Sequence, residues 1–232
     1  MQRDTIISEA TELLREVFET YQPQVRAIYL WGSATCEDFD PARSDIDSIA
    51  IVSDDFPVDM EETIRAKLGK DKSFPNPFGF RLLYISELNT GVQKSPLVGF
   101  IEVPLLLADM KYWIPVIGSV ARSDFSLPDA TIDELIAIRV KRNAVSHWED
   151  VSAITPADFP YFLKNMARTL DLIARKNGFD GPFSYGALVA NTPEEYKECA
   201  RALIECRSAK YSETTRAKYT NIFQKFIDDL RM

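Results

Sequence analysis

Histidine and cysteine are scarce in this chain, which has one histidine and three cysteines among its 232 residues. The single histidine, His147, excludes a metal site built from several imidazoles. Cys36, Cys199 and Cys206 form no CxxC pair, and their odd number argues against a disulfide framework. The cysteine pattern therefore favours a reducing compartment, and we predict a cytoplasmic protein.

Long apolar runs and an excess of positive charge are also missing. The longest apolar stretch, residues 103–108, is far too short to cross a bilayer, and polar side chains throughout the first fourteen residues are unlike a signal peptide. The 27 Lys and Arg residues are outnumbered by 35 Asp and Glu residues, which gives a net charge of −8. We therefore expect no binding to membranes or nucleic acid, whereas a cationic small molecule would be attracted.

The hydrophobic pattern divides the chain into two halves of different character. Three short apolar runs predict strands, at residues 27–31, 46–52 and 80–85. Apolar residues at helical spacing lie before, between and after these runs, at 4–21, 58–68 and 104–112. Beyond a polar, aperiodic segment at 118–129 we predict no strand, but helices at 132–148, 159–176, 194–209 and 214–230, with a short segment at 183–190 after a Gly- and Pro-containing break.

This order of elements predicts an α+β fold with two domains. Residues 1–128 are expected to form a small mixed β-sheet flanked by helices, and residues 129–232 an all-α helical bundle. The hydrophobic share of 46% and the charged share of 27% are those of an ordinary globular protein, and the chain is long enough for both domains.

Polar residues at the ends of the first two predicted strands carry the chemical signal. The first strand ends in Gly32-Ser33, and the second begins Ser44-Asp45-Ile46-Asp47. Alternation along a strand puts Asp45 and Asp47 on one side, where two carboxylates need a cation and suit Mg²⁺. Gly32 permits close backbone approach, and Ser33 offers a hydroxyl and an N–H at a predicted helix N-terminus, which favours a bound phosphate. A metal beside a phosphate indicates nucleotidyl or phosphoryl transfer.

The stretch YLWGSATCEDFDPARSDIDSIAIV, residues 29–52, resembles the signature of the nucleotidyltransferase superfamily related to DNA polymerase β. Within that superfamily the chain looks most similar to the bacterial aminoglycoside adenylyltransferases that modify streptomycin and spectinomycin. The strings VPLLLADMKYWIPVIG and MARTLDLIARKNGF resemble the end of their catalytic domain and part of their helical C-terminal domain. The resemblance implies an antibiotic-resistance type of enzyme that uses Mg²⁺, and ATP as substrate, to adenylylate a hydroxyl of a small molecule.

The same resemblance implies roles for individual residues. Asp45 and Asp47 would ligate Mg²⁺ and take part in catalysis. The nucleotide-binding residues would be Gly32, Ser33, Ser44 and Arg168. Trp148 and Asp150 would bind the acceptor, with Glu149 and Asp158 as further partners for ammonium groups.

The third predicted strand departs from the family pattern. The family places a third carboxylate there, as a metal ligand or as the base that deprotonates the acceptor hydroxyl, and here we place Arg81 at that position. Glu87, just past the strand, is the candidate that we keep for the catalytic base, although it does not match by position.

Because of this departure, three other functions stay open. The first is protein AMPylation, as in antitoxin-like nucleotidyltransferases, and the second is nucleotide binding with catalysis lost. The third is a ribonuclease of the HEPN type, because Arg142 and His147 match its Arg-x4-His motif. The acceptor, the preferred nucleotide and the oligomeric state are not fixed by the sequence.

Overall fold

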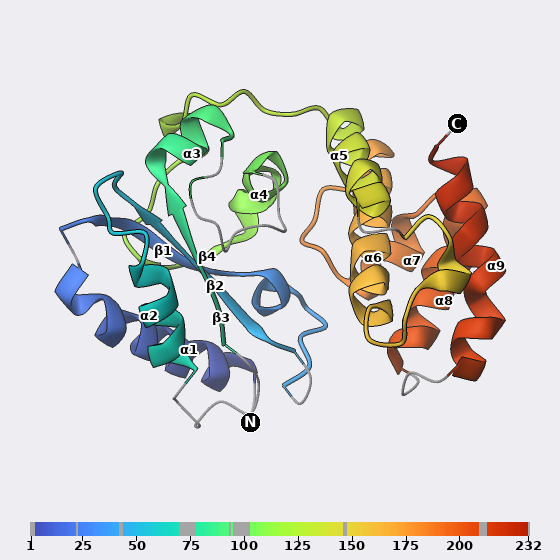
Figure 1. Cartoon of the computed structure of the whole chain (residues 1–232), viewed down its shortest axis with the longest axis horizontal. Helices are drawn as coiled ribbons and strands as arrows, with labels where there is room; N and C mark the ends of the chain where they lie inside the picture. The colour runs from blue at the N-terminus through green and yellow to red at the C-terminus, as the bar shows by residue number, and fades with distance from the viewer. Residues whose placement is uncertain are drawn as a thin grey trace. The chain divides into compact units, whose positions relative to one another are not determined.

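The computed structural model describes residues 3–21, 23–41, 44–69, 78–92, 94, 103–145, 148–208 and 213–231. The chain divides into two compact units, Met1–Asp129 and Ala130–Met232, called here the N-terminal unit and the helical unit (Figure 1). A small mixed β-sheet with flanking helices fills the first unit, and the described part of the second is helical. The predicted α+β fold is confirmed.

The N-terminal unit alternates helices and strands. Its helices and strands are α1 (Arg3–Phe18), β1 (Val25–Trp31), β2 (Ile46–Val52), α2 (Met60–Leu68), β3 (Phe78–Tyr84), α3 (Ile85–Thr90), α4 (Val103–Asp109) and β4 (Ile114–Ile117). Short 3₁₀ turns lie between them: η1 (Glu19–Tyr21), η2 (Gly32–Thr35), η4 (Met110–Tyr112) and η5 (Arg122–Asp124).

The four strands lie in the order β3-β2-β1-β4. β1 is antiparallel to both β2 and β4, whereas β2 and β3 are parallel. As a result, β1 ends at the same end of the sheet at which the other three strands begin. We call this the near end of the sheet, and the opposite end, where β2 and β3 finish, the far end.

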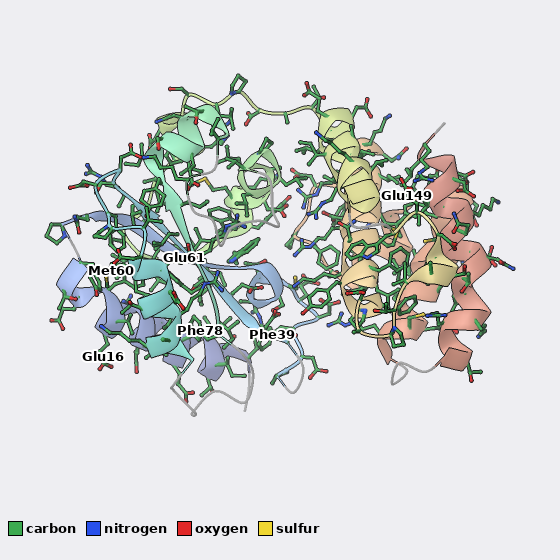
Figure 2. The ribbon with its side chains drawn as sticks, in the orientation of Figure 1. Glu16, Phe39, Met60, Glu61, Phe78 and Glu149 are labelled. Atoms are coloured by element: carbon green, nitrogen blue, oxygen red, sulfur yellow. The ribbon has the colours of Figure 1, made fainter. Side chains whose placement is uncertain are left out.

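Each face of the sheet has its own hydrophobic core. α1 covers one face with Ile6, Ala10, Leu14 and Phe18, which are four residues apart and so form a single stripe, and α2 adds residues to the same core. Figure 2 labels Phe39 and Phe78, which belong to this core as well. The opposite face packs against α4. In Figure 1, α1 and α2 are accordingly seen on one side of the sheet and α4 on the other.

The sequence analysis predicted no strand at the position of β4. It has four residues and contains Pro115, so neither its length nor its composition signals a strand. Proline is tolerated here because β4 lies at the edge of the sheet, where one side of the strand needs no hydrogen-bond donors.

The helical unit is built as predicted from consecutive helices. They are α5 (Ile132–Val145), α6 (Phe159–Lys176), α7 (Tyr185–Asn191), α8 (Lys197–Ser208) and α9 (Glu213–Asp229), with 3₁₀ turns η6 (Val151–Ala153) and η7 (Glu194–Tyr196). Phe159, Phe162 and Phe223 contact one another in its core, with ring centroids 5.7–6.3 Å apart. In the part of the chain that the structure describes, no helix is long and apolar enough to span a membrane.

Candidate active site

The carboxylate of Asp47 lies between two glycines at the near end of the sheet. A Cβ atom at Gly32 would lie 2.7 Å from one carboxylate oxygen of Asp47, and a Cβ atom at Gly79 would lie closer still to the other. Gly79 is the residue of β3 directly opposite Asp47 in the sheet. Gly32 also has a positive φ of 64°, which residues with a Cβ rarely adopt. Two glycines therefore create the space that the Asp47 carboxylate occupies.

The turn η2 is tied to the start of β2 by a side-chain hydrogen bond. The hydroxyl of Ser33 donates to the backbone carbonyl of Asp45 at 2.5 Å. Arg3 of α1 donates to the carbonyl of Ala34 at 2.8 Å, and the hydroxyl of Thr35 donates to the carbonyl of Gly32 at 2.9 Å. Ser33 lies in the first turn of a helix, as expected, but this helix is a single four-residue 3₁₀ segment, Gly32–Thr35.

Ser44 closes the loop that leads into the acidic pair. Its hydroxyl oxygen accepts the backbone N–H of Asp40 at 3.0 Å, and its own N–H donates to the Asp40 carbonyl at 2.7 Å. Ser44 is buried, whereas Asp45 and Asp47 are half-buried. Asp45 and Asp47 thus stand at the start of β2, next to the Gly32-Ser33 turn.

The donors at this end of the sheet fit a magnesium ion that a nucleotide helps to hold. Nowhere among the residues that the structure describes do three His, Cys, Asp or Glu side chains gather around one point. The protein therefore offers the carboxylates of Asp45 and Asp47, and Mg²⁺ is commonly bound by one or two carboxylates together with substrate phosphates and water.

The strand register places Arg81 relative to Asp47. Asp47 lies opposite Gly79, and Arg81 lies two residues further along, opposite Ile49. Alternation along β3 keeps Arg81 on the same face as Gly79, so it is a diagonal neighbour of Asp47, and it is only 7% exposed. The residue that faces the acidic pair in β3 is thus a glycine, and β3 itself contains no carboxylate.

Glu87 lies at the far end of the sheet. Its carboxylate is fully buried and accepts the backbone N–H groups of Tyr84 at 2.7 Å and Lys94 at 2.5 Å. α3 begins at Ile85, so Glu87 caps the first turn of that helix. The strand length from Gly79 to Tyr84 separates it from Asp47 by about 16 Å. The structure therefore does not bring Glu87 to the acidic pair.

The remaining predicted residues lie in the helical unit. Arg168 of α6 is half-buried, and its guanidinium carbon lies 4.1 Å from the centre of the Phe183 ring. Trp148 contacts the Phe162 ring edge-on, with centroids 6.0 Å apart. These two contacts would exist in a purely structural role, and the binding roles of both residues stay predictions.

The acidic residues near Trp148 also have partners within the helical unit. Asp150 accepts hydrogen bonds from the hydroxyl and the N–H of Ser152, and these bonds lower the pKa of its carboxyl. Glu149 pairs with Arg231, and Asp158 accepts the hydroxyl of Thr155 at 2.6 Å. The side chains of the Arg-x4-His motif, Arg142 and His147, lie outside the described residues.

The sequence analysis missed Gly79 and Trp31 as residues of the near end. A glycine at the start of a strand is a known sign of close approach by another group, so Gly79 could have been found. Trp31 was visible as a large aromatic directly before Gly32-Ser33, but its position opposite Asp47 depends on the register, which the sequence does not state.

No protein-family description matches this chain, and no curated protein is detectably similar to it in sequence. Among solved structures, it is similar to a crystal structure of spectinomycin adenyltransferase AAD(9) from Enterococcus faecialis with ATP and spectinomycin. The TM-score is 0.58 at 14% identity, and the match covers 97% of this chain and 98% of the other. At this identity the likeness shows the fold alone, a small mixed β-sheet with flanking helices followed by a helical C-terminal part.

Proposed function

We propose that this chain transfers an adenylyl group from ATP, with Mg²⁺, to a hydroxyl of a small cationic acceptor such as an aminoglycoside. The observation that carries this proposal is the placement of the Asp47 carboxylate between Gly32 and Gly79, where the Gly32-Ser33 turn meets Asp45. The similar fold of an enzyme solved with ATP and spectinomycin supports it. The net charge of −8 suits a cationic acceptor.

In this proposal, Asp45 and Asp47 hold the metal ion and the turn at Gly32 and Ser33 holds the phosphates. Bound Mg²⁺ would neutralise negative charge on the triphosphate. The Ser33 hydroxyl already donates its proton to the Asp45 carbonyl, so contact with a phosphate falls to backbone N–H groups or requires that hydroxyl to rotate. Arg81, a buried cation on the same sheet face as Asp47, would bind a phosphate oxygen.

The transfer step itself needs a base. The acceptor oxygen would bond to the α-phosphorus while the bond to pyrophosphate breaks, and the hydroxyl proton must go to an acceptor group. Because β3 carries no carboxylate and Glu87 caps α3, a second function is favoured by the same structure: nucleotide binding with catalysis lost. Protein AMPylation remains the other acceptor class.

Titration calorimetry tests the nucleotide site directly. We expect ATP to bind in the presence of Mg²⁺, and we expect no detectable binding by Asp47→Ala, because one of the two metal-holding carboxylates is gone. Asp54→Ala is the matched control, since Asp54 lies at the far end of the sheet, close to Ser86 and Lys94. Unchanged Mg²⁺–ATP binding by Asp47→Ala would contradict the assignment.

A transfer assay then separates the two functions. Radiolabelled ATP is incubated with the protein and a panel that includes streptomycin and spectinomycin. Label on the acceptor, lost in Asp47→Ala, supports adenylyl transfer. Tight Mg²⁺–ATP binding without label on any acceptor supports the binding protein instead.

A further inference from the structure

One row of residues crosses β3, β2 and β1 at the near end of the sheet and ends at the residue that precedes β4. Asp47 of β2 lies opposite Gly79 of β3 on one side and opposite Trp31 of β1 on the other. Leu30 pairs with Ile114 at the start of β4, so the residue before β4, Trp113, comes next to Trp31. The two indole centroids are 6.4 Å apart. The acidic pair therefore has a glycine on one flank and two tryptophans on the other.

The two tryptophans differ in exposure. Trp113 is 7% exposed, and its ring lies 5.5 Å from that of Tyr29, which is buried as well. Trp31 packs only partly against this cluster and stays half-buried. The indole of Trp113 is thus fixed by the core, and it supports the indole of Trp31, the residue opposite Asp47 in the sheet.

The buried indole N–H of Trp113 has no hydrogen-bond acceptor among the described residues. An indole nitrogen can only donate, and a buried donor without an acceptor costs free energy. Because this N–H is enclosed by the core, it is no contact for a ligand, and Trp113 acts here only as the support against which Trp31 packs.

We propose that Trp31 is the platform on which the purine base of the nucleotide stacks, held in place by the edge contact of Trp113. The inference rests on the proposed function, because it needs a nucleotide whose phosphates lie at Gly32 and Ser33. Trp31 is bonded directly to Gly32, so it is next to the turn that would hold the phosphates of such a nucleotide. Aromatic stacking also tolerates different bases, so the platform would accept purine nucleotides in general.

Tryptophan fluorescence gives a readout that does not depend on catalysis, since the chain has three tryptophans. We expect Mg²⁺–ATP to quench the fluorescence of the wild type and of Trp148→Phe, and to leave that of Trp31→Leu unchanged. Stacking of a base on an aromatic side chain is worth about tenfold or more in affinity, so ATP should bind Trp31→Leu about tenfold more weakly. Trp31→Phe keeps an aromatic plane and should retain most of the affinity.

Inorganic tripolyphosphate separates a base contact from a phosphate contact. With Mg²⁺ it should bind Trp31→Leu and the wild type equally, because it has no base. Equal ATP affinity in Trp31→Leu and the wild type would overturn the platform and leave the nucleotide site standing. Equal losses for ATP and tripolyphosphate, or quenching by streptomycin rather than ATP, would also overturn it. Failure of the wild type to bind either phosphate compound would instead remove the proposed function itself.

Discussion

The two ends of the sheet both gather carboxylates, but they use them differently. At the far end, Glu87 accepts two backbone N–H groups, and Asp54 accepts hydrogen bonds from Ser86 and Lys94 that lower the pKa of its carboxyl. At the near end, the Asp47 carboxylate lies over two positions without Cβ atoms, and it is half-buried.

The difference lies in what the surrounding backbone does. At the far end, backbone N–H groups of a helix start and a loop are donated to the acid, so the acid stabilises the local fold. At the near end, two glycines lie against the acid, and the absence of their Cβ atoms makes the space that the Asp47 carboxylate occupies. Carboxylates close to a strand end can thus have quite different surroundings, and spacing in the sequence does not distinguish the two cases.

Among the variants that test this comparison, Glu87→Gln is expected to have the largest effect, a loss of stability. The glutamine amide can accept one of the two backbone N–H groups, but it turns an N–H₂ group toward the other. Loss of a charge-assisted hydrogen bond at a fully buried position should cost about 2–3 kcal/mol of the free energy of unfolding. Urea unfolding measures the loss, and the exposed Glu62→Gln on α2 serves as the control, with less than about 0.5 kcal/mol expected.

Mg²⁺–ATP affinity of the folded Glu87→Gln protein should equal that of the wild type. The opposite pattern, normal stability with adenylyl transfer abolished, would restore Glu87 as the catalytic base that the sequence suggested.

Gly79→Ala tests the near end and is expected to have the next largest effect. A methyl group at residue 79 would overlap the Asp47 carboxylate, which must then rotate away. We expect Mg²⁺–ATP affinity to fall about tenfold, which corresponds to about 1.4 kcal/mol. Gly186→Ala in α7 is the matched control, since its methyl group would meet no atom within 4 Å. An unchanged dissociation constant for Gly79→Ala would mean that Asp47 does not hold the metal in this orientation.

Much of the fold could be predicted from periodicity alone. β2 occupies the predicted residues 46–52, and α6 the predicted 159–176, because both have unbroken apolar patterns. β4 could not be predicted, since four residues around Pro115 carry no period and depend on pairing with β1. Pairing between distant segments is a property of the folded chain, which local sequence does not encode.

The candidate site was predictable only in part for the same reason. Gly32, Asp45 and Asp47 flank two strand ends that are close in sequence, so the signature located them. Gly79 and Trp31 face Asp47 through the register of β3 and β1, and a shift of two residues separates Gly79 from Arg81. The sequence identified the missing carboxylate on β3, and the register adds that Gly79 is the residue directly opposite Asp47.

Tyr84→Phe tests the far end of the sheet from within its core, and it is expected to have the smallest effect. The Tyr84 ring is 1% exposed, and its hydroxyl has no hydrogen-bond partner among the described residues. Removing a buried, unsatisfied hydroxyl should therefore stabilise the protein by about 1 kcal/mol in urea unfolding at pH 7.

Burial, together with the charges of Glu61 and Glu87, raises the pKa of Tyr84 to about 12, from an ordinary value near 10. Because the folded-state pKa is the higher one, this group costs no additional stability below about pH 10, and wild-type stability falls as the pH rises from 10 toward 12. Tyr84→Phe lacks that fall, so its advantage should widen over this range, whereas Tyr161→Phe, at a 68% exposed residue, should follow the wild type. A loss of stability in Tyr84→Phe at pH 7 would show instead that the Tyr84 hydroxyl has a hydrogen-bond partner, and that the polar groups at the far end are all hydrogen-bonded.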